Sequence, residues 1–308
     1  MRPEQRGQSG TDDCSNRPAG DAGGKRIERR KPVHPLTCWP AAARRQVAGV
    51  FTDIDDTLTT DGKLTGDALA ALAALKHAGL HVIAITGRPA GWTEAFAEQW
   101  PVDAIVAENG AVALIPTGVP GAARRLYQQS AGVRMDNATK LRQAARRILS
   151  EVPGAVLASD SGGRETDIAI DHSEHVQLAA DGIAQVVGVM RQEGMNASVS
   201  SIHINGWYGD HDKLSGARWI VMELFGRRLD DEIHRWAYVG DSTNDALMFE
   251  QFANSVGVAN VRRFEAQLTH LPRYIAAAER GAGFAEVVAA IFESRIGMQS
   301  AAAFTAPG

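Results

Sequence analysis

Short apolar segments alternate with helix-like segments from residue 45 onward, and this rhythm restricts the fold more than any other feature of the chain. The segments 47–52, 81–86 and 104–107 are nearly continuous apolar runs, as expected of strands that are buried on both faces. The segments 67–77 and 90–99 lie between them and read as helices. This β-α-β-α-β order predicts an α/β fold with a Rossmann-like parallel sheet.

The rhythm breaks between residues 113 and 207 and resumes after them. The broken stretch consists of strand-like segments at 124–128, 156–159, 166–171 and 197–205 and of helix-like segments at 136–150 and 178–193. Helix 213–225, strand 236–240 and further elements then continue the first rhythm. We therefore expect an α+β module at 113–207, inserted into a core domain that is formed by residues 45–112 and 208–298.

Both ends of the chain read as tails. Residues 1–44 are rich in Gly, Pro, Arg, Asp and Ser and have almost no aliphatic side chains. Such a segment buries too little apolar area to offset the entropy lost on ordering, so it is predicted to be disordered. Residues 299–308 are expected to form a short C-terminal tail.

The composition excludes several classes of protein. Of the 308 residues, 44% are hydrophobic, which is enough for a buried core, and the net charge of -4 argues against a nucleic-acid binder. No apolar run approaches the roughly 20 residues of a transmembrane helix, so no membrane association is expected. Both cysteines, Cys14 and Cys38, lie near the N-terminus, which leaves no thiolate metal site to the body of the protein. A reducing, cytoplasmic location is expected.

Three carboxylates, those of Asp53, Asp55 and Asp56, follow at the end of the first apolar segment. Buried carboxylates without partners are costly, and like charges this close raise each other's pKa. Either a cation lies beside them or the segment is a solvated loop. If the backbone stays extended, Asp53 and Asp55 point to the same side, because they are two residues apart.

Polar residues also follow the other predicted strands, and ligands of open parallel sheets bind beyond the carboxyl ends of the strands. Thr86, Gly87 and Arg88 end the second strand, and Lys213 opens the helix after the insertion. The segment 240–245 adds two carboxylates, an amide and two hydroxyls. We expect these groups to converge on one rim, where acids, an ammonium group and hydroxyls suit a hard divalent cation together with a phosphate.

The residue types indicate roles in phosphoryl transfer. Asp53 can act as the nucleophile, because carboxylates form aspartyl-phosphate intermediates. Asp55 can protonate the leaving oxygen and later activate water. A cation held by Asp53 and Asp241 would neutralise the acids and the phosphoryl oxygens. The groups expected to orient the transferring oxygens are Thr86, the backbone amides near Gly87, and Asn244.

The four segments, in this order, resemble the four motifs of the haloacid dehalogenase (HAD) superfamily of phosphatases. The insertion between the second and third motifs, together with Glu108-Asn109-Gly110 after the third strand, resembles the Cof-like, type-IIB branch. The resemblance covers about residues 45 to 295. It implies that the inserted module is a cap domain, that the cofactor is Mg²⁺ and that the partner is a small phosphorylated metabolite.

The resemblance also implies roles for single residues. Asp53 becomes the nucleophile, and Asp55 becomes the acid and base, with its backbone carbonyl as a metal ligand. The phosphate-binding residues are then Thr86, Gly87, Arg88, Lys213 and Asn244. The metal-binding residues are Asp53, Asp55, Asp241 and Asp245, of which Asp245 supports either the metal or Lys213. Asp56 stands where many members carry glycine, and its side chain is expected to point to solvent.

Substrate specificity is expected to reside in the inserted module. The segment 164–172 alternates between polar and apolar residues, so that its polar side chains share one face. That face either looks down on the substrate, with Arg164 as an anion or sugar contact, or is the wet face of a half-exposed sheet. His203 and Asn205 lie before the return to the core. They either reach the site or, in the case of His203, serve a structural purpose.

We therefore expect a Mg²⁺-dependent phosphomonoesterase that hydrolyses a small phosphate of a sugar or sugar acid through an aspartyl-phosphate intermediate. Two alternatives stay open. One is a phosphohexomutase resembling the phosphomannomutases, which returns the phosphoryl group to its substrate. The other is a catalytically silent sensor of Mg²⁺ and a phosphate ligand on the same scaffold.

Overall fold

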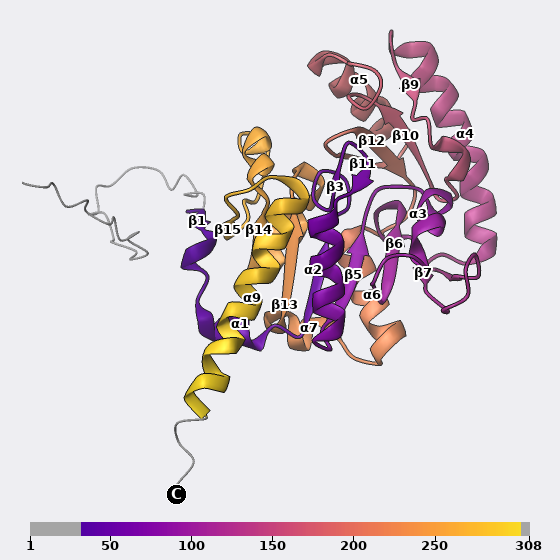
Figure 1. The fold of residues 1–308 in the computed structure, drawn as a ribbon. Coiled ribbons are helices and arrows are strands. Elements are labelled where there is room, and N and C mark those ends of the chain that lie inside the picture. Colours follow the sequence, from indigo (N-terminus) through magenta and orange to yellow (C-terminus); the bar gives the residue numbers. More distant parts are fainter. Residues whose placement is uncertain (1–31, 303–308) are drawn as a thin grey trace, which may run out of the picture.

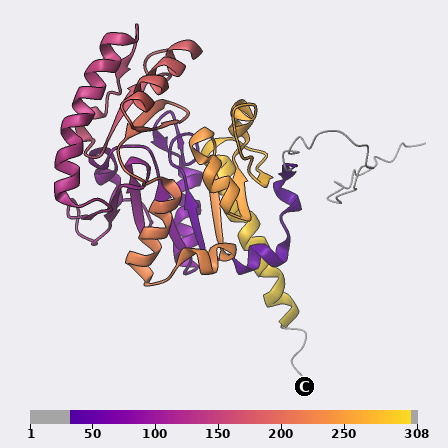
Figure 2. The same cartoon turned by 180° about the vertical axis from the view of Figure 1, so that it is seen from behind.

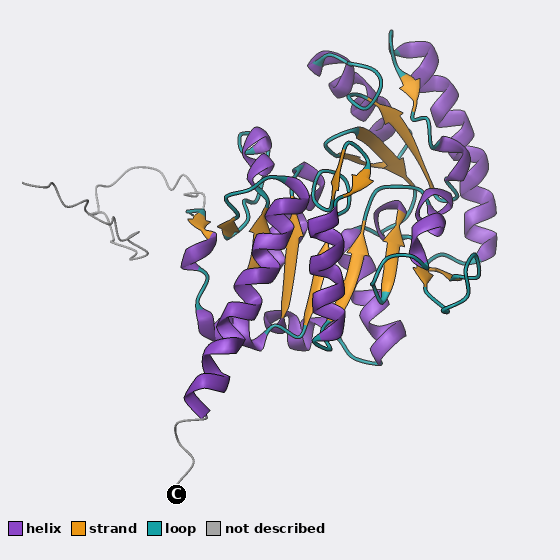
Figure 3. Ribbon diagram, viewed as in Figure 1, coloured by secondary structure: helices purple, strands orange, loops and turns teal. Residues whose placement is uncertain are grey.

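The computed structural model describes residues 32–302, and the side chains of residues 32–295. Within this range the chain forms a nine-stranded sheet, a four-stranded sheet and a two-stranded hairpin. Figure 1 shows the two larger sheets in two bodies, a core and a smaller domain above it, and Figure 3 shows helices beside both sheets. The α/β class predicted from the sequence is confirmed.

The nine-stranded sheet has the order β1-β15-β14-β13-β2-β5-β6-β7-β8. Neighbours from β1 to β6 pair in parallel, whereas β7 and β8 add an antiparallel edge. The bounds are His34–Pro35 (β1), Gly49–Thr52 (β2), His81–Ile85 (β5), Ala104–Ala107 (β6), Val112–Ile115 (β7), Arg124–Tyr127 (β8), Trp236–Gly240 (β13), Asn254–Gly257 (β14) and Tyr274–Ile275 (β15). The hairpin after β2 consists of Thr59–Thr60 (β3) and Lys63–Leu64 (β4).

Helices cover both faces of this sheet because its central strands are apolar on both sides. In β2, Val50 belongs to the apolar cluster under α2 and α9, whereas Phe51 belongs to the cluster under α6 and α8. Figures 1 and 2 show these two layers from opposite sides. The helices of the core are Ala41–Gln46 (α1), Gly66–His77 (α2), Ala90–Ala97 (α3), Lys213–Phe225 (α6), Leu229–Glu232 (α7), Ala246–Gln251 (α8) and Arg280–Ala302 (α9). Across residues 32–302, no helix combines the length and the apolar character that crossing a membrane requires.

The smaller domain, called the cap domain from here on, has an antiparallel sheet of order β11-β12-β10-β9. Its elements are Ala131–Glu151 (α4), Val156–Leu157 (β9), Asp167–Asp171 (β10), Ala180–Gln192 (α5), Asn196–Val199 (β11) and His203–Trp207 (β12). Both helices share one apolar core with the sheet, in which Ile170 and Ile204 meet Ile148 and Met190. The cap domain thus has a hydrophobic core of its own.

The cap domain begins later than the predicted insertion 113–207. The strands β7 and β8, which lie within that range, belong to the nine-stranded sheet, and the first element of the cap domain is α4 after its N-cap Ser130. A two-stranded antiparallel extension of one sheet and a strand pair of a separate domain have the same local sequence pattern. Only the identity of the partner strand distinguishes them, and here β7 pairs with β6 of the core sheet.

The predicted strand 197–205 is a hairpin in the structure, formed by β11 and β12. The hydroxyl of Ser200 accepts hydrogen bonds from the backbone N–H groups of Ile202 and His203 at 3.3 and 3.0 Å. Serine competes for backbone groups in this way at turns, and here it divides one apolar run into two strands.

The prediction of a disordered segment 1–44 is wrong for residues 32–44. The strand β1 pairs with β15, and Trp39 is only 1% exposed, stacks on Tyr274 and donates from Nε1 to Asn254 Oδ1 at 3.0 Å. One large buried aromatic ring supplies the apolar area that the aliphatic count missed. At the other end, α9 continues to Ala302, so the predicted tail 299–308 begins as helix. Residues 1–31, with Cys14, and residues 303–308 lie outside the described residues.

Candidate active site

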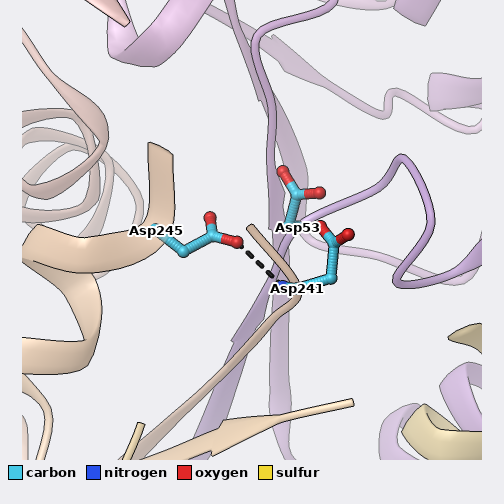
Figure 4. A group of neighbouring side chains, drawn as sticks. All are labelled: Asp53, Asp241 and Asp245. Atoms are coloured by element: carbon cyan, nitrogen blue, oxygen red, sulfur yellow. Dashed lines mark hydrogen bonds between the residues drawn. The ribbon is translucent and has the colours of Figure 1, made fainter. Parts of the chain in front are cut away.

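Two acidic residues follow neighbouring strands at the same edge of the nine-stranded sheet. Asp53 follows β2 and Asp241 follows β13, and these strands pair in parallel. Asp245 joins them from the turn that begins α8. One carboxylate oxygen from each residue lies within 4.8 Å of the others, and all three residues are buried. Figure 4 shows the three side chains gathered in this way.

Lys213 completes this cluster from the far side of the insertion. It is the first residue of α6, where Asp212 caps the helix and forms a capping box with Ser215. Its Nζ lies 2.5 Å from Asp53 Oδ1 and 2.7 Å from Asp245 Oδ1. Lys213 and Asp53 are 160 residues apart in sequence, and the structure brings them into contact, as expected for residues of one rim.

Asp245 holds the loop after β13 rather than facing an open space. Its Oδ2 accepts the backbone N–H groups of Asp241 and Ser242 at 2.9 and 3.1 Å, and its Oδ1 accepts from Lys213 and from the Tyr238 hydroxyl. Gly240 is required here, because a Cβ at this position would lie 2.5 Å from Asp245 Oδ2. Both oxygens of Asp245 are thus occupied, which favours its support of Lys213 and of Asp241 over direct metal ligation.

The cluster holds more acidic groups than basic groups. Burial raises the pKa of Asp53 to about 8, with Asp245 and Asp55 adding to the rise and Lys213 opposing it. Burial, together with Asp53 and Asp245, raises the pKa of Asp241 well above its usual range. Burial alone would lower the pKa of Lys213, but the adjacent Asp245 and Asp53 raise it overall, so Lys213 is charged. One ammonium group therefore faces three acids.

The donor set fits a small, hard cation. Asp241 Oδ2 accepts a hydrogen bond from Asn260 Nδ2 at 3.0 Å, whereas Asp241 Oδ1 is buried and has no hydrogen-bond partner among the described residues. An unpartnered buried carboxylate oxygen is costly, and a cation beside it would remove that cost. Carboxylate and carbonyl oxygens are the protein ligands that Mg²⁺ prefers. Asp53 and Asp241 are the residues of this cluster that would hold it.

Arg88 binds Asp55 instead of an open site. Its Nε lies 3.0 Å from each carboxylate oxygen of Asp55, and its two other nitrogens contact Asp160 at 3.1 Å and Glu174 at 2.7 Å. Asp160 and Glu174 belong to the cap domain, so this arginine ties cap and core together. Burial raises the pKa of Asp55, and Arg88 opposes that rise. The predicted role of Arg88 in phosphate binding thus requires that at least one of three carboxylates leave it.

The other predicted phosphate-binding residues lie at the ends of β5 and β13. Thr86 is fully buried and its Oγ1 accepts from the backbone N–H of Arg88 at 3.0 Å. A Cβ on Gly87 would lie 3.2 Å from the Asn205 side chain, so the lack of a side chain there lets the cap domain approach. Asn244 makes a local contact, accepting from the Ser242 hydroxyl at 3.0 Å. The phosphate-binding roles of these residues stay predictions.

The three predicted specificity residues all lie at the boundary between cap and core. The side chain of Arg164 is buried, pairs with Asp167 at 2.9 Å and donates to the backbone carbonyl of Gly87 at 2.9 Å. Asn205 donates to the same carbonyl at 3.2 Å. His203 reaches Arg88 only through Glu174, which lies 2.9 Å from its Nε2. The polar face of the cap sheet therefore points toward the core and is not a wet face.

Sequence reasoning missed the residue that anchors the cap domain. Glu108 is fully buried and accepts from the backbone N–H groups of Ala90, Glu165 and Thr166 and from the Thr166 hydroxyl. Its φ of 51° is uncommon for a residue other than glycine. In the sequence, the segment 108–110 contributed only to the family resemblance. Nothing in the sequence, however, identified Asp160, Glu174 or Asn260 as partners of the site.

The contact between cap and core is close at two further places. A Cβ on Gly91 would lie 2.8 Å from the Cα of Gly163 in the cap domain. The two linkers between the domains are tied together, because Gln129 Nε2 donates to the Tyr208 carbonyl at 2.7 Å. Next to it, Gln128 Nε2 donates to the Gly110 carbonyl at 2.8 Å. The structure thus has the cap domain closed on the core.

Comparison with known proteins supports the same family. Residues 50–150 match the family model of haloacid dehalogenase-like hydrolases, and no curated protein matches the chain in sequence. A Plasmodium vivax protein described as a HAD/COF-like hydrolase has a TM-score of 0.59 at 16% identity, over 82% of this chain and 98% of that one. The sucrose-phosphatase of Synechocystis has a TM-score of 0.57 at 17% identity, over 80% and 98%. A HAD subclass IIB sugar phosphatase has a TM-score of 0.56 at 15% identity, over 82% and 99%.

At these identities the structural likeness concerns the fold, which includes both the core and the inserted cap domain. The family match covers the first two motifs, with Asp53 and Asp55 after β2 and Thr86 after β5. The resemblance derived from the sequence is therefore confirmed over residues 50–150, which match haloacid dehalogenase-like hydrolases, and the fold of the described chain is similar to that of HAD/COF-like and HAD subclass IIB structures.

Proposed function

We propose that this chain is a Mg²⁺-dependent phosphomonoesterase that acts on a small phosphate ester, with an aspartyl-phosphate intermediate. The observation that carries the proposal is the buried group of Asp53, Asp241 and Lys213. It offers a nucleophilic carboxylate, an unpartnered oxygen for a hard cation and a fixed positive charge within one cluster. Aspartyl-phosphate chemistry needs these three parts.

In the proposed first step, a carboxylate oxygen of Asp53 attacks the phosphorus atom, and the bond from phosphorus to the ester oxygen breaks. Asp55 gives its proton to that leaving oxygen. In the second step a water molecule attacks phosphorus, Asp55 takes a proton from the water, and the bond to Asp53 breaks. Phosphate leaves and both carboxyl groups return to their first state. When bound, Mg²⁺ supplies charge neutralisation for the carboxylates and the phosphoryl oxygens.

Two features of the site support Asp55 as the acid and base. Burial raises its pKa, a shift toward the protonated form that the first step uses. Arg88 holds its carboxylate, and an entering phosphate dianion is a stronger partner for a guanidinium group than one carboxylate. A substrate phosphate that displaces Asp55 from Arg88 would therefore free the Asp55 carboxyl group for proton transfer in the first step.

The cap domain supports a substrate of small size. Arg88, Arg164 and Glu108 bind groups on both sides of the boundary, so the closed form excludes water during the first step. Opening must follow before the product leaves. The sucrose-phosphatase and the subclass IIB sugar phosphatase share this fold, and a phosphorylated sugar or sugar acid is the substrate class that we infer.

A phosphate-release assay tests the proposal. The purified chain is incubated with Mg²⁺ and a panel of phosphate esters that includes sucrose phosphate, trehalose 6-phosphate, hexose 1- and 6-phosphates and phosphorylated sugar acids. We expect release of inorganic phosphate from at least one of them, and its loss when EDTA removes the metal. Isomerised hexose phosphate without release would establish the mutase instead. No turnover of any ester, with Mg²⁺-dependent binding retained, would establish the sensor.

A further inference from the structure

A polar cavity lies at the edge of the nine-stranded sheet opposite the cluster of Asp53, Asp241 and Lys213. It has a volume of about 770 Å³ and is lined by residues that precede or begin three central strands, among them Ala48 before β2, His81 at the start of β5 and Arg235 before β13. Ala48 and Asp53 are five residues apart along one extended strand, so the cavity lies roughly 16 Å from the catalytic cluster. In Figure 1, α1 and α7 mark this edge, and the cap domain lies at the other.

Four arginines from four different elements line this cavity. They are Arg45 of α1, Arg227 after α6, Arg235 before β13 and Arg295 of α9. The cavity has no aspartate or glutamate in its lining. Segments from both ends of the described chain and from the middle thus place guanidinium groups around one space, although the whole chain has a net charge of -4.

Most of this positive charge is unmatched. Arg227 pairs with Glu232 at 3.3 Å, and Arg295 donates to the backbone carbonyl of Val47. Within residues 32–295, neither Arg45 nor Arg235 has an ion-pair partner. Among the described side chains, only Arg227 of these four arginines therefore has a carboxylate partner. Exposed arginines gathered without counter-charges repel each other, so their convergence favours an anion between them.

Two guanidinium nitrogens of the cavity lack partners although they are buried. Nε of Arg227 and Nε of Arg295 have no hydrogen-bond acceptor among the described residues. His81 Nε2 lies 3.0 Å from Arg227 Nη2, and since arginine only donates, this imidazole is neutral with its proton on Nδ1. Burial lowers the pKa of His81, in agreement with a neutral ring. The cavity therefore presents hydrogen-bond donors and fixed cations.

We propose that this cavity, called the arginine pocket, binds a small anion that carries at least two phosphate groups. Guanidinium groups bind phosphate oxygens through paired hydrogen bonds, and three uncompensated ones match the charge of a diphosphate better than that of a monophosphate. The volume lies within the range of about 300–1,000 Å³ that small-molecule sites have. The anion would connect α1, the central strands and α9. It would stabilise the folded chain, because it would bind the folded state and not the unfolded state.

Isothermal titration with sodium pyrophosphate tests this site, in a buffer of physiological ionic strength that holds EDTA in place of divalent metal. The test variant is the double substitution Arg45→Ala and Arg235→Ala, because both side chains are exposed and their loss leaves the core intact. The matched control is Arg228→Ala, a neighbour in sequence of Arg227 whose exposed side chain does not line the pocket. The melting temperature is measured with and without pyrophosphate.

We expect pyrophosphate to bind the wild-type chain and the control alike and to raise their melting temperatures. The double variant should bind it about tenfold more weakly or worse, since each lost arginine removes a charge-assisted hydrogen bond. Orthophosphate should bind the wild-type pocket more weakly than pyrophosphate. Equal affinity in all three proteins, or no binding to the wild type, overturns the proposal. So does a single-stranded oligonucleotide that binds through these arginines while pyrophosphate does not.

Discussion

The catalytic cluster and the boundary between cap and core lie on the same rim, but their charges are matched differently. In the cluster, three acids face Lys213 alone and Asp241 Oδ1 has no partner among the described residues. At the boundary, Arg88 and Arg164 contact four carboxylates, and each of these accepts at least one hydrogen bond. The cluster thus keeps an unpartnered oxygen beside which a cation would fit, whereas each of the four carboxylates at the boundary has a partner. Changes in the cluster should remove chemistry, and changes at the boundary should alter closure.

The largest effect is expected from Asp53→Asn. The amide keeps the size of the side chain but cannot attack phosphorus, so phosphate release should fall by about a thousandfold or more. The melting temperature in EDTA should stay equal or rise, because one buried acid is removed from a crowded group. Rates and melting curves are measured beside those of Asp56→Asn. The Asp56 side chain pairs with Arg280, and its loss should leave the rate within a factor of about two. Near-normal turnover by Asp53→Asn would remove the assigned nucleophile.

The second-largest effect is expected from the loss of the proposed metal site. Mg²⁺ should raise the melting temperature of the wild type, because a cation that binds only the folded chain stabilises it. In Asp241→Asn the unpartnered carboxylate oxygen is gone, so this rise should disappear and turnover should fall by about a hundredfold or more. Differential scanning calorimetry with Mg²⁺ and with EDTA measures the rise. A variant that keeps the full Mg²⁺ effect would show that the cation binds elsewhere.

A smaller effect is expected from a change at the boundary between cap and core. A methyl group on Gly91 would lie 2.8 Å from the Cα of Gly163, so Gly91→Ala should hold the cap domain partly open. We expect kcat/KM to fall about tenfold while Mg²⁺ binding is unchanged. Gly162→Ala is the control, because a Cβ at that position has open space around it. A loss of Mg²⁺ binding in Gly91→Ala would mean that the two regions are not separable.

The smallest effect is expected from Glu174→Gln, which weakens one contact of Arg88. The hydrogen bond from His203, with help from Arg88, lowers the pKa of Glu174 to about 2. Because the folded pKa lies below the ordinary value, this contribution is present above about pH 4.5 and is lost as the pH falls toward about 2. The wild type should melt roughly 2 °C above the variant at neutral pH, and this difference should shrink over that interval. A difference that is independent of pH would argue against the ion pair. Glu193→Gln, which breaks a pair inside the cap domain, is the control.

The sequence predicted the catalytic cluster better than the boundary, and the reason is physical. Asp53 and Asp241 are placed by their position after apolar strands, and parallel strands end at a common edge. The partners of Arg88 depend on how the cap domain docks on the core. No local sequence pattern encodes that docking. The place of β7 and β8 was missed for a related reason, since their pattern does not reveal that β7 pairs with β6 of the core. The docking of Trp39 was missed because its partner Asn254 is distant in sequence. Hydrophobic periodicity predicts which residues of a segment are buried, but it does not predict which other segment buries them.

The tie between the two linkers has a consequence for how the cap domain moves. Because the side chain of Gln129 is bonded to the carbonyl of Tyr208, the two crossings of the chain act as one pivot instead of two independent tethers. Such a pivot favours a hinge motion of the cap domain over independent movement of the two linkers. We expect it to limit the ways in which cap residues can meet the rim that carries Asp53. The linkers would then contribute to the selectivity of the proposed enzyme without touching its substrate.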